Sequence, residues 1–142
     1  MDRKLNEYRS LASIEIPTKG WIHATRTALG MSLRQLGGRL GVKPQTVHDL
    51  EAAEASGGIT LRTLREAGAA MSLKLVYGFV PQTQSLEELI ENRARELAKE
   101  IVLRTSHSMK LEDQENARER IEQATRERAQ EILREMPRYL WD

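Results

Sequence analysis

The amino-acid sequence predicts an all-α protein with a group of about five short helices, a short extended segment or strand, and a C-terminal helical hairpin. Of the 142 residues, 30% are charged and only 4% are aromatic. This balance is more typical of helices with solvated faces than of sheets, which favour aromatic and β-branched residues. In addition, apolar residues recur at helical spacing along most of the chain, and glycine and proline separate the periodic segments.

The N-terminal residues 1–17 are predicted to form a short helix or arm. Leu5, Tyr8 and Leu11 have helical spacing, and Pro17 interrupts the pattern because it lacks an N–H group. We assign residues 18–82 to one domain. Its first helix starts near Trp21 and is expected to end at a glycine that can adopt a left-handed backbone.

Residues 32–56 carry the most informative pattern. Ser32 is a candidate N-cap, Gly41 ends the first helix, and Pro44 fits the first turn of the next one. Gly37 is small where two helices must approach closely. This spacing predicts a helix-turn-helix unit, whose second helix fits the major groove of DNA. Two helices of an unrelated bundle are the alternative.

A further helix is predicted from Thr60 to Met71, and the pattern then changes. Residues 73–80 alternate loosely, are rich in β-forming residues and end at Pro81, which predicts one short strand or extended segment. A single strand needs a partner, and the identical strand of a second copy is one source.

Residues 83–142 are predicted to form a helical region for dimerisation or partner binding. Ser85 caps a helix that reaches about Arg104, and a second helix runs from Leu111 to Met136. The thin apolar stripe of the second helix indicates a hairpin with the first helix, or a helix that awaits a partner. The first helix is interpreted as core or homodimer seam, with a membrane-surface helix as the alternative. The candidate dimer or partner residues are Leu86, Ile90, Leu97, Ile101, Tyr139 and Trp141.

The aromatic side chains near the C-terminus have two interpretations. They either anchor a partner, because aromatic residues dominate interface hot spots, or dock back onto the core of the chain itself.

The charge distribution favours a polyanionic partner for the front of the chain. Residues 1–84 carry 11 basic and 7 acidic side chains, whereas residues 112–142 carry 6 basic and 9 acidic ones.

No apolar run is long enough for a membrane span, and the chain has no cysteine, which suits a reducing cytoplasm. We therefore expect a cytoplasmic protein that does not associate with a membrane.

Catalytic and metal-binding patterns are not evident in the sequence. His23, His48 and His107 lie far apart without ligand spacing, and we interpret them as surface or capping residues. No convergent catalytic set or nucleotide-binding loop is recognisable. We therefore expect no enzyme activity, no cofactor and no metal.

At residues 21–71 the chain resembles the helix-turn-helix domain of the xenobiotic-response-element class, which is found in phage repressors and antitoxins. Other segments resemble more narrowly the mobile mystery protein A family, and the likeness covers nearly the whole chain. The segments are 19–22, 28–32, 59–61, 75–77, 109–112 and 140–142. Proteins of that family are associated with mobile genetic elements and are encoded beside a Fic-domain partner. The resemblance implies an antitoxin-like regulator that binds double-stranded DNA.

The resemblance also implies which residues contact DNA. Gln45, Thr46, His48 and Asp49, at the start of the second helix, are the candidates for reading bases. The candidates for phosphate contact are Arg34, Arg39, Lys43 and Arg62, with the backbone N–H groups of Ser56 and Gly57.

The charge of the second helix departs from what DNA binding favours. This helix carries Asp49, Glu51 and Glu54 and has no Arg or Lys after Lys43, although Glu51 is often acidic in this class and is a candidate structural residue. We therefore expect weak non-specific binding and dependence on dimerisation. The predicted function is autorepression by a homodimer on a palindromic operator. The alternative is a module that binds and restrains a Fic-domain partner.

Overall fold

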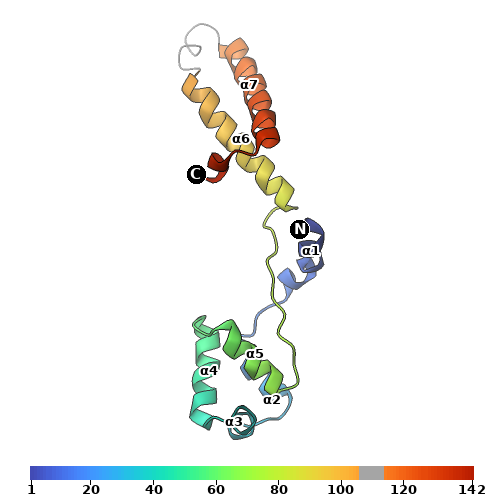
Figure 1. The fold of residues 1–142 in the computed structure, drawn as a ribbon, viewed down its shortest axis with the longest axis vertical. Coiled ribbons are helices and arrows are strands. Elements are labelled where there is room, and N and C mark those ends of the chain that lie inside the picture. Colours follow the sequence, from blue (N-terminus) through green and yellow to red (C-terminus); the bar gives the residue numbers. More distant parts are fainter. Residues whose placement is uncertain (106–113) are drawn as a thin grey trace. The chain divides into compact units, whose positions relative to one another are not determined.

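A computed structural model describes residues 1–105 and 114–142, and the regular structure in these two ranges is helical throughout (Figure 1). The predicted all-α class is confirmed. The elements are α1 Asp2–Glu7, the 3-10 helix η1 Arg9–Ser13, α2 Gly20–Ala28, α3 Leu33–Leu40, α4 Pro44–Ser56, α5 Leu61–Ala70, α6 Leu86–Thr105, α7 Gln114–Glu135 and the 3-10 helix η3 Arg138–Trp141.

The chain divides into two compact units. One consists of residues 10–78, and the other combines residues 1–9 with residues 79–142. The unit of residues 10–78 therefore ends a few residues before the predicted boundary at residue 82. Of the segment 1–17, which was predicted as a separate arm, residues 1–9 belong with the C-terminal helices and residues 10–17 belong to the other unit.

Residues 10–78, all of them described, contain the four α-helices α2–α5, where about five helices were predicted. Residues 73–80 form neither helix nor strand in the structure, so the extended alternative of that prediction holds and the strand does not. The core of this unit is a cluster of five buried side chains from all four helices or their ends. They are Ile22, Leu36, Val47, Ala67 and Met71.

Local signals in the sequence set the helix ends of this unit. The Ser32 hydroxyl accepts from the Gln35 N–H at 3.1 Å, and the Gln35 side chain accepts in return from the Ser32 N–H, which together form a capping box. Gly41 ends α3 with a φ of 69°, a left-handed backbone that glycine adopts without strain. The Thr60 hydroxyl caps α5 by accepting from the Thr63 N–H at 3.2 Å. The predicted caps are confirmed.

The second unit contains the predicted helical hairpin, in which α6 and α7 lie side by side (Figure 1). Its core is built largely of small side chains, so the two helices approach closely. The buried cluster consists of Ala94, Ala98, Ala129, Ile132 and Leu140. The sequence pattern placed the larger residues of α6 at the seam, but Ile90, Leu97 and Ile101 only flank this cluster and are partly buried.

The N-terminal helix α1 is tied to the start of α6 by hydrogen bonds. The Asp2 carboxylate accepts from the Leu86 N–H at 2.6 Å and from the Glu87 N–H at 3.3 Å. The Arg9 guanidinium also donates to the Gln84 carbonyl. A carboxylate at a helix N-terminus satisfies unpaired N–H groups and complements the helix dipole. This long-range cap explains why residues 1–9 belong to the C-terminal unit.

No helix in the described ranges combines the length and the apolarity that crossing a membrane requires.

Replacement of Gly37 by alanine is expected to destabilise the fold. A Cβ at this position would lie 2.7 Å from the backbone carbonyl oxygen of Val42, in the turn between α3 and α4. Because the turn must move to relieve the clash, Gly37→Ala is expected to cost about 1 to 3 kcal/mol of unfolding free energy. Urea denaturation followed by circular dichroism measures this cost.

The adjacent Gly38 provides the matched control. A Cβ there meets no atom within 4 Å, so Gly38→Ala adds a better helix former without a clash. This variant is expected to be more stable by about 0.5 to 1 kcal/mol. Equal effects of the two substitutions would contradict the close approach at Gly37.

Candidate nucleic-acid interface

Helix α4 has one side in the core and the opposite side in solvent. Val47 and Glu51, one turn apart, are buried against the other helices. The four candidate base-reading residues, Gln45, Thr46, His48 and Asp49, are all exposed. The fold therefore brings the four predicted side chains together on the solvent side of the first two turns of α4.

Two of these four side chains are already paired. The Gln45 amide donates to the Asp49 carboxylate at 3.0 Å, between residues four apart on one helix face. This hydrogen bond holds the amide in one orientation. It also supplies the exposed Asp49 carboxylate with a hydrogen-bond donor from the same helix.

Glu51 is the one charged residue of the buried core in the described part of the chain, and it is 6% exposed. Its Oε1 accepts from the Arg26 Nε at 2.5 Å, and its Oε2 lies 3.3 Å from an Arg26 terminal nitrogen and 3.2 Å from the His23 Nδ1. The second terminal nitrogen of Arg26 donates to the Met31 carbonyl at 2.8 Å. One carboxylate and one guanidinium thus connect α4, α2 and the turn that leads into α3.

The surroundings of Glu51 stabilise its charged form. Burial alone would raise the pKa of its carboxyl, but hydrogen bonds from Arg26 and His23, with their charges, outweigh burial. The pKa of Glu51 therefore lies below its ordinary value of 4.5. Its charge is matched inside the unit and does not face solvent.

Glu54, one turn further along α4, caps the N-terminus of α2. Its two carboxylate oxygens accept from the Trp21 N–H at 2.7 Å and from the Ile22 N–H at 2.8 Å. Gly20 allows this approach, because a Cβ there would lie 2.8 Å from the same carboxylate. The Glu54 carboxylate thus interacts with the positive end of the α2 dipole.

These contacts change the electrostatic expectation for α4. From the sequence, three acidic residues of α4 were expected to repel DNA, but two of them are bound by groups of α2. Asp49 is the remaining acidic residue of α4 on its solvent side. The field that α4 presents to solvent is therefore less unfavourable than the sequence alone indicates.

The candidate phosphate contacts divide into two groups. The side chains of Arg34, Lys43 and Arg62 are exposed and form no ion pair within the described ranges. Arg39 is exposed as well, but it donates to the Ala70 carbonyl at 3.2 Å, at the C-terminal end of α5.

The backbone groups proposed for phosphate contact are not positioned for that role. Ser56 is the last residue of α4, and the Gly57 N–H donates to the Glu54 carbonyl at 3.0 Å. These groups lie at the negative end of the α4 dipole, whereas an anion site needs free N–H groups at the positive end. The hydrogen bonding at this break, which the sequence does not show, therefore does not favour the backbone of Ser56 and Gly57 as a phosphate contact.

The candidate partner residues of the second unit also divide. Leu86, Ile90, Leu97 and Ile101 are partly buried, and the last three of them pack against the hairpin core. Tyr139 and Trp141 remain 42% and 61% exposed. Leu140 between them is buried, and the Arg93 guanidinium donates to its carbonyl at 2.6 Å. The C-terminus therefore docks on the hairpin through Leu140 and not through the aromatic residues.

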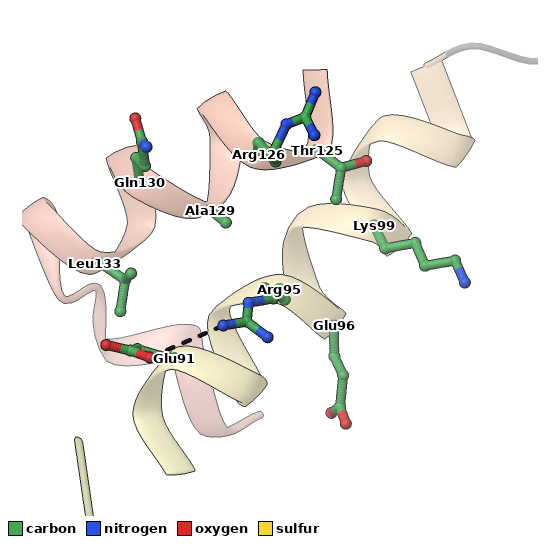
Figure 2. Close-up of a pocket in the computed structure, with 9 residues that line it drawn as sticks. All are labelled: Glu91, Arg95, Glu96, Lys99, Thr125, Arg126, Ala129, Gln130 and Leu133. Carbon is green, nitrogen blue, oxygen red and sulfur yellow. Dashed lines mark ion pairs between the residues drawn. The ribbon is translucent and has the colours of Figure 1, made fainter. Parts of the chain in front are cut away.

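A groove of about 520 Å³ runs along one side of the hairpin, and Figure 2 shows its lining. Ala129 and Leu133 supply the apolar part. The charges around it are mixed, and Arg95 pairs with Glu91 at 3.9 Å. The nine lining residues are Glu91, Arg95, Glu96, Lys99, Thr125, Arg126, Ala129, Gln130 and Leu133.

Sequence reasoning missed the structural roles of three residues. His23 and Arg26 are partners of the buried Glu51, and Glu54 caps α2 through N–H groups 32 and 33 residues before it in the sequence. An acidic residue on the inward side of α4, one turn after Val47, was the available signal, since a buried carboxylate requires a partner.

The two histidines in the described ranges, His23 and His48, share no site. His23 contacts Glu51, His48 is exposed on α4, and His107 lies outside the described residues. Within the described ranges, no cluster of three or more His, Asp or Glu residues is arranged to hold a metal ion.

Comparisons with known proteins found no matching family model, no matching curated protein and no matching solved structure.

Removal of the Glu51 charge is expected to destabilise the protein in a pH-dependent way. Glu51→Gln leaves the Arg26 charge without its partner, which is expected to cost about 2 to 4 kcal/mol near pH 7. Because the folded pKa is lowered, the carboxylate contributes its full stability above the unfolded pKa, near 4.5, and loses it as pH falls through the folded pKa. The stability gap between wild type and variant should therefore narrow below pH 4.5.

Urea denaturation at a series of pH values measures this gap. The matched control is Asp49→Asn, which removes an exposed carboxylate from the same helix and should change stability by less than about 0.5 kcal/mol. A gap for Glu51→Gln that stays constant with pH would contradict the ionised state of Glu51.

Proposed function

We propose that the protein is a sequence-specific, DNA-binding transcriptional regulator, in which α3, the turn and α4 act as a helix-turn-helix and α4 enters the major groove. One observation carries the proposal. Gln45, Thr46, His48 and Asp49 are exposed together at the start of α4, while the other acidic groups of this helix are engaged by α2. A helix with polar side chains at its exposed N-terminal end is the element that reads base edges in this class of motif.

The side chains on this face have the chemistry for direct readout. The Gln45 amide can form two hydrogen bonds to an adenine, and the Thr46 methyl can contact a thymine methyl. Asp49 can accept from the amino group of a cytosine, and its hydrogen bond to Gln45 holds the amide in place before binding. Since Asp49 repels phosphates, this pair favours specificity over general affinity.

The phosphate contacts in this proposal come from side chains only. Arg34, Lys43 and Arg62 are exposed near the beginnings of α3, α4 and α5, without ion pairs in the described ranges. Arg39 joins them if it releases the Ala70 carbonyl. Such contacts position the protein on the duplex and make binding sensitive to salt.

The proposed mechanism is autorepression by a homodimer in the cytoplasm. Two recognition helices about 34 Å apart would occupy successive major grooves of a palindromic operator and exclude polymerase. This mechanism agrees with the resemblance to the mobile mystery protein A family and its antitoxin-like setting on mobile genetic elements. Membership of that family is part of the proposal.

Substitutions on α4 separate base reading from phosphate contact. We expect Gln45→Ala to weaken specific binding by about 1 to 3 kcal/mol and to relax one operator position. Lys43→Ala should weaken binding to all sequences alike and lower the salt slope by about one. Fluorescence anisotropy on DNA from upstream of the gene and on scrambled DNA, at two salt concentrations, measures both effects.

Two outcomes would contradict these assignments. An equal loss on both DNAs from Gln45→Ala would remove it from base reading. Equal and weak binding of the wild type to both DNAs would argue against an autoregulatory site in that fragment.

A second candidate function is a module that binds and restrains a Fic-domain protein. The observation that favours it is the groove beside Ala129 and Leu133, whose apolar floor and mixed charges suit a helix of another protein (Figure 2). This function uses the C-terminal hairpin and needs no DNA.

A blocking substitution in the groove tests this second function. Thr125→Arg places a large side chain in the groove and should weaken binding of the neighbouring Fic-domain protein at least about 10-fold, a loss of about 1.4 kcal/mol. The control is Gln123→Arg, an exposed position of α7 that does not line the groove. Calorimetric titration measures both variants, and equal affinities would exclude the groove as the docking surface.

A further inference from the structure

Residues 73–80 form an exposed apolar segment between α5 and α6, and Figure 1 shows it as an extended trace. Its sequence is Leu-Lys-Leu-Val-Tyr-Gly-Phe-Val, rich in residues that favour strands. Val76 is 62% exposed, Tyr77 60% and Phe79 85%. Side chains of this type are normally covered, so their exposure here points to a missing partner.

The backbone of the same segment is also unpaired. Within the described residues, no hydrogen bond involves an N–H or C=O group of residues 74–80, although the Leu73 N–H still donates to α5. A row of free backbone groups with β-forming side chains is a template for pairing with another strand. The missing partner is therefore an extended chain and not a helix.

We propose that residues 73–80 pair with the same segment of a second copy of the chain, as two antiparallel strands related by a two-fold axis. The proposal names the dimer contact of the regulator and in that respect rests on the homodimer of the proposed function. A two-fold axis through this ribbon has the symmetry that a palindromic operator requires.

The position of the single charge in this segment selects the antiparallel arrangement. Lys74 is the only charged residue of the eight. In a parallel, in-register pair the two Lys74 side chains would be neighbours about 4.8 Å apart, and they would repel each other. In an antiparallel pair centred on Val76 the two Lys74 side chains are separated by four residues, about 13 Å along the ribbon.

The alternation of side chains supports the same arrangement. In a strand, residues 73, 75, 77 and 79 lie on one face. Antiparallel pairing places this face of both copies on the same side of the ribbon, which joins two leucines, a tyrosine and a phenylalanine from each chain. Because a two-stranded ribbon alone is only marginally stable, we expect a dissociation constant on the order of 10 µM.

Sedimentation equilibrium of the full chain without DNA tests the dimer contact. Val76→Pro removes one N–H donor from the middle of the segment and should raise the dissociation constant at least about 10-fold. Val76→Thr keeps the backbone donor and the β-branched shape and should leave the constant within about 3-fold. Circular dichroism checks that both variants keep their helices.

Single cysteines test the strand direction, since the chain has no cysteine of its own. Under mild oxidation Val76→Cys should form the disulfide-linked dimer at least about 10-fold faster than Leu73→Cys, because a disulfide needs Cα atoms about 5.5 Å apart. In the antiparallel ribbon residue 73 lies more than about 12 Å from its copy.

Three results would overturn the proposal. The first is a protein that stays monomeric up to about 200 µM, far above the expected dissociation constant. The second is a dimer that Val76→Pro leaves intact. The third is disulfide formation at equal rates from cysteines at positions 73 and 76. Because these measurements contain no DNA, they separate the two proposals. A protein without sequence preference on DNA would contradict the proposed regulator function but not the strand pairing. A dimer held by another surface would contradict the strand pairing but not the regulator function.

Discussion

The buried ion pair between Glu51 and Arg26 is the interaction on which the arrangement of residues 10–78 depends. The carboxylate is 6% exposed, and an unpaired charge at that depth would be strongly destabilising. Its partners come from α2, and Arg26 also bonds the Met31 carbonyl just before α3. With Val47 on the same side of α4, this pair fixes the rotation of the helix about its own axis.

The electrostatics of the candidate interface follow from that fixed rotation. With Glu51 inside and Glu54 on the N-terminus of α2, Asp49 is the remaining acidic residue of α4 toward solvent. The same rotation places Gln45 and His48 on the outside. A helix that appeared unfavourable for a polyanion on formal charge thus presents a polar face with one carboxylate, which is itself bonded to Gln45.

The second unit depends on different physics. Ala94 and Ala98 on α6 face Ala129 on α7, so the hairpin is held by close packing of small side chains around Ile132 and Leu140. Its start is closed by Asp2, which is more than 80 residues away in sequence and caps α6. One side of the hairpin retains a groove, and the segment before it retains exposed apolar residues.

The sequence by itself determined the helices, because their signals are local. Ser32, Gly41, Pro44 and Thr60 act within one turn of their own positions, and the exposed residues of α4 follow from helical periodicity. Only the tertiary structure decided which charged side chains are paired within the protein. The partners of Glu51 and Glu54, the cap from Asp2 and the alanine seam all join residues distant in sequence, and local spacing carries no information about such contacts.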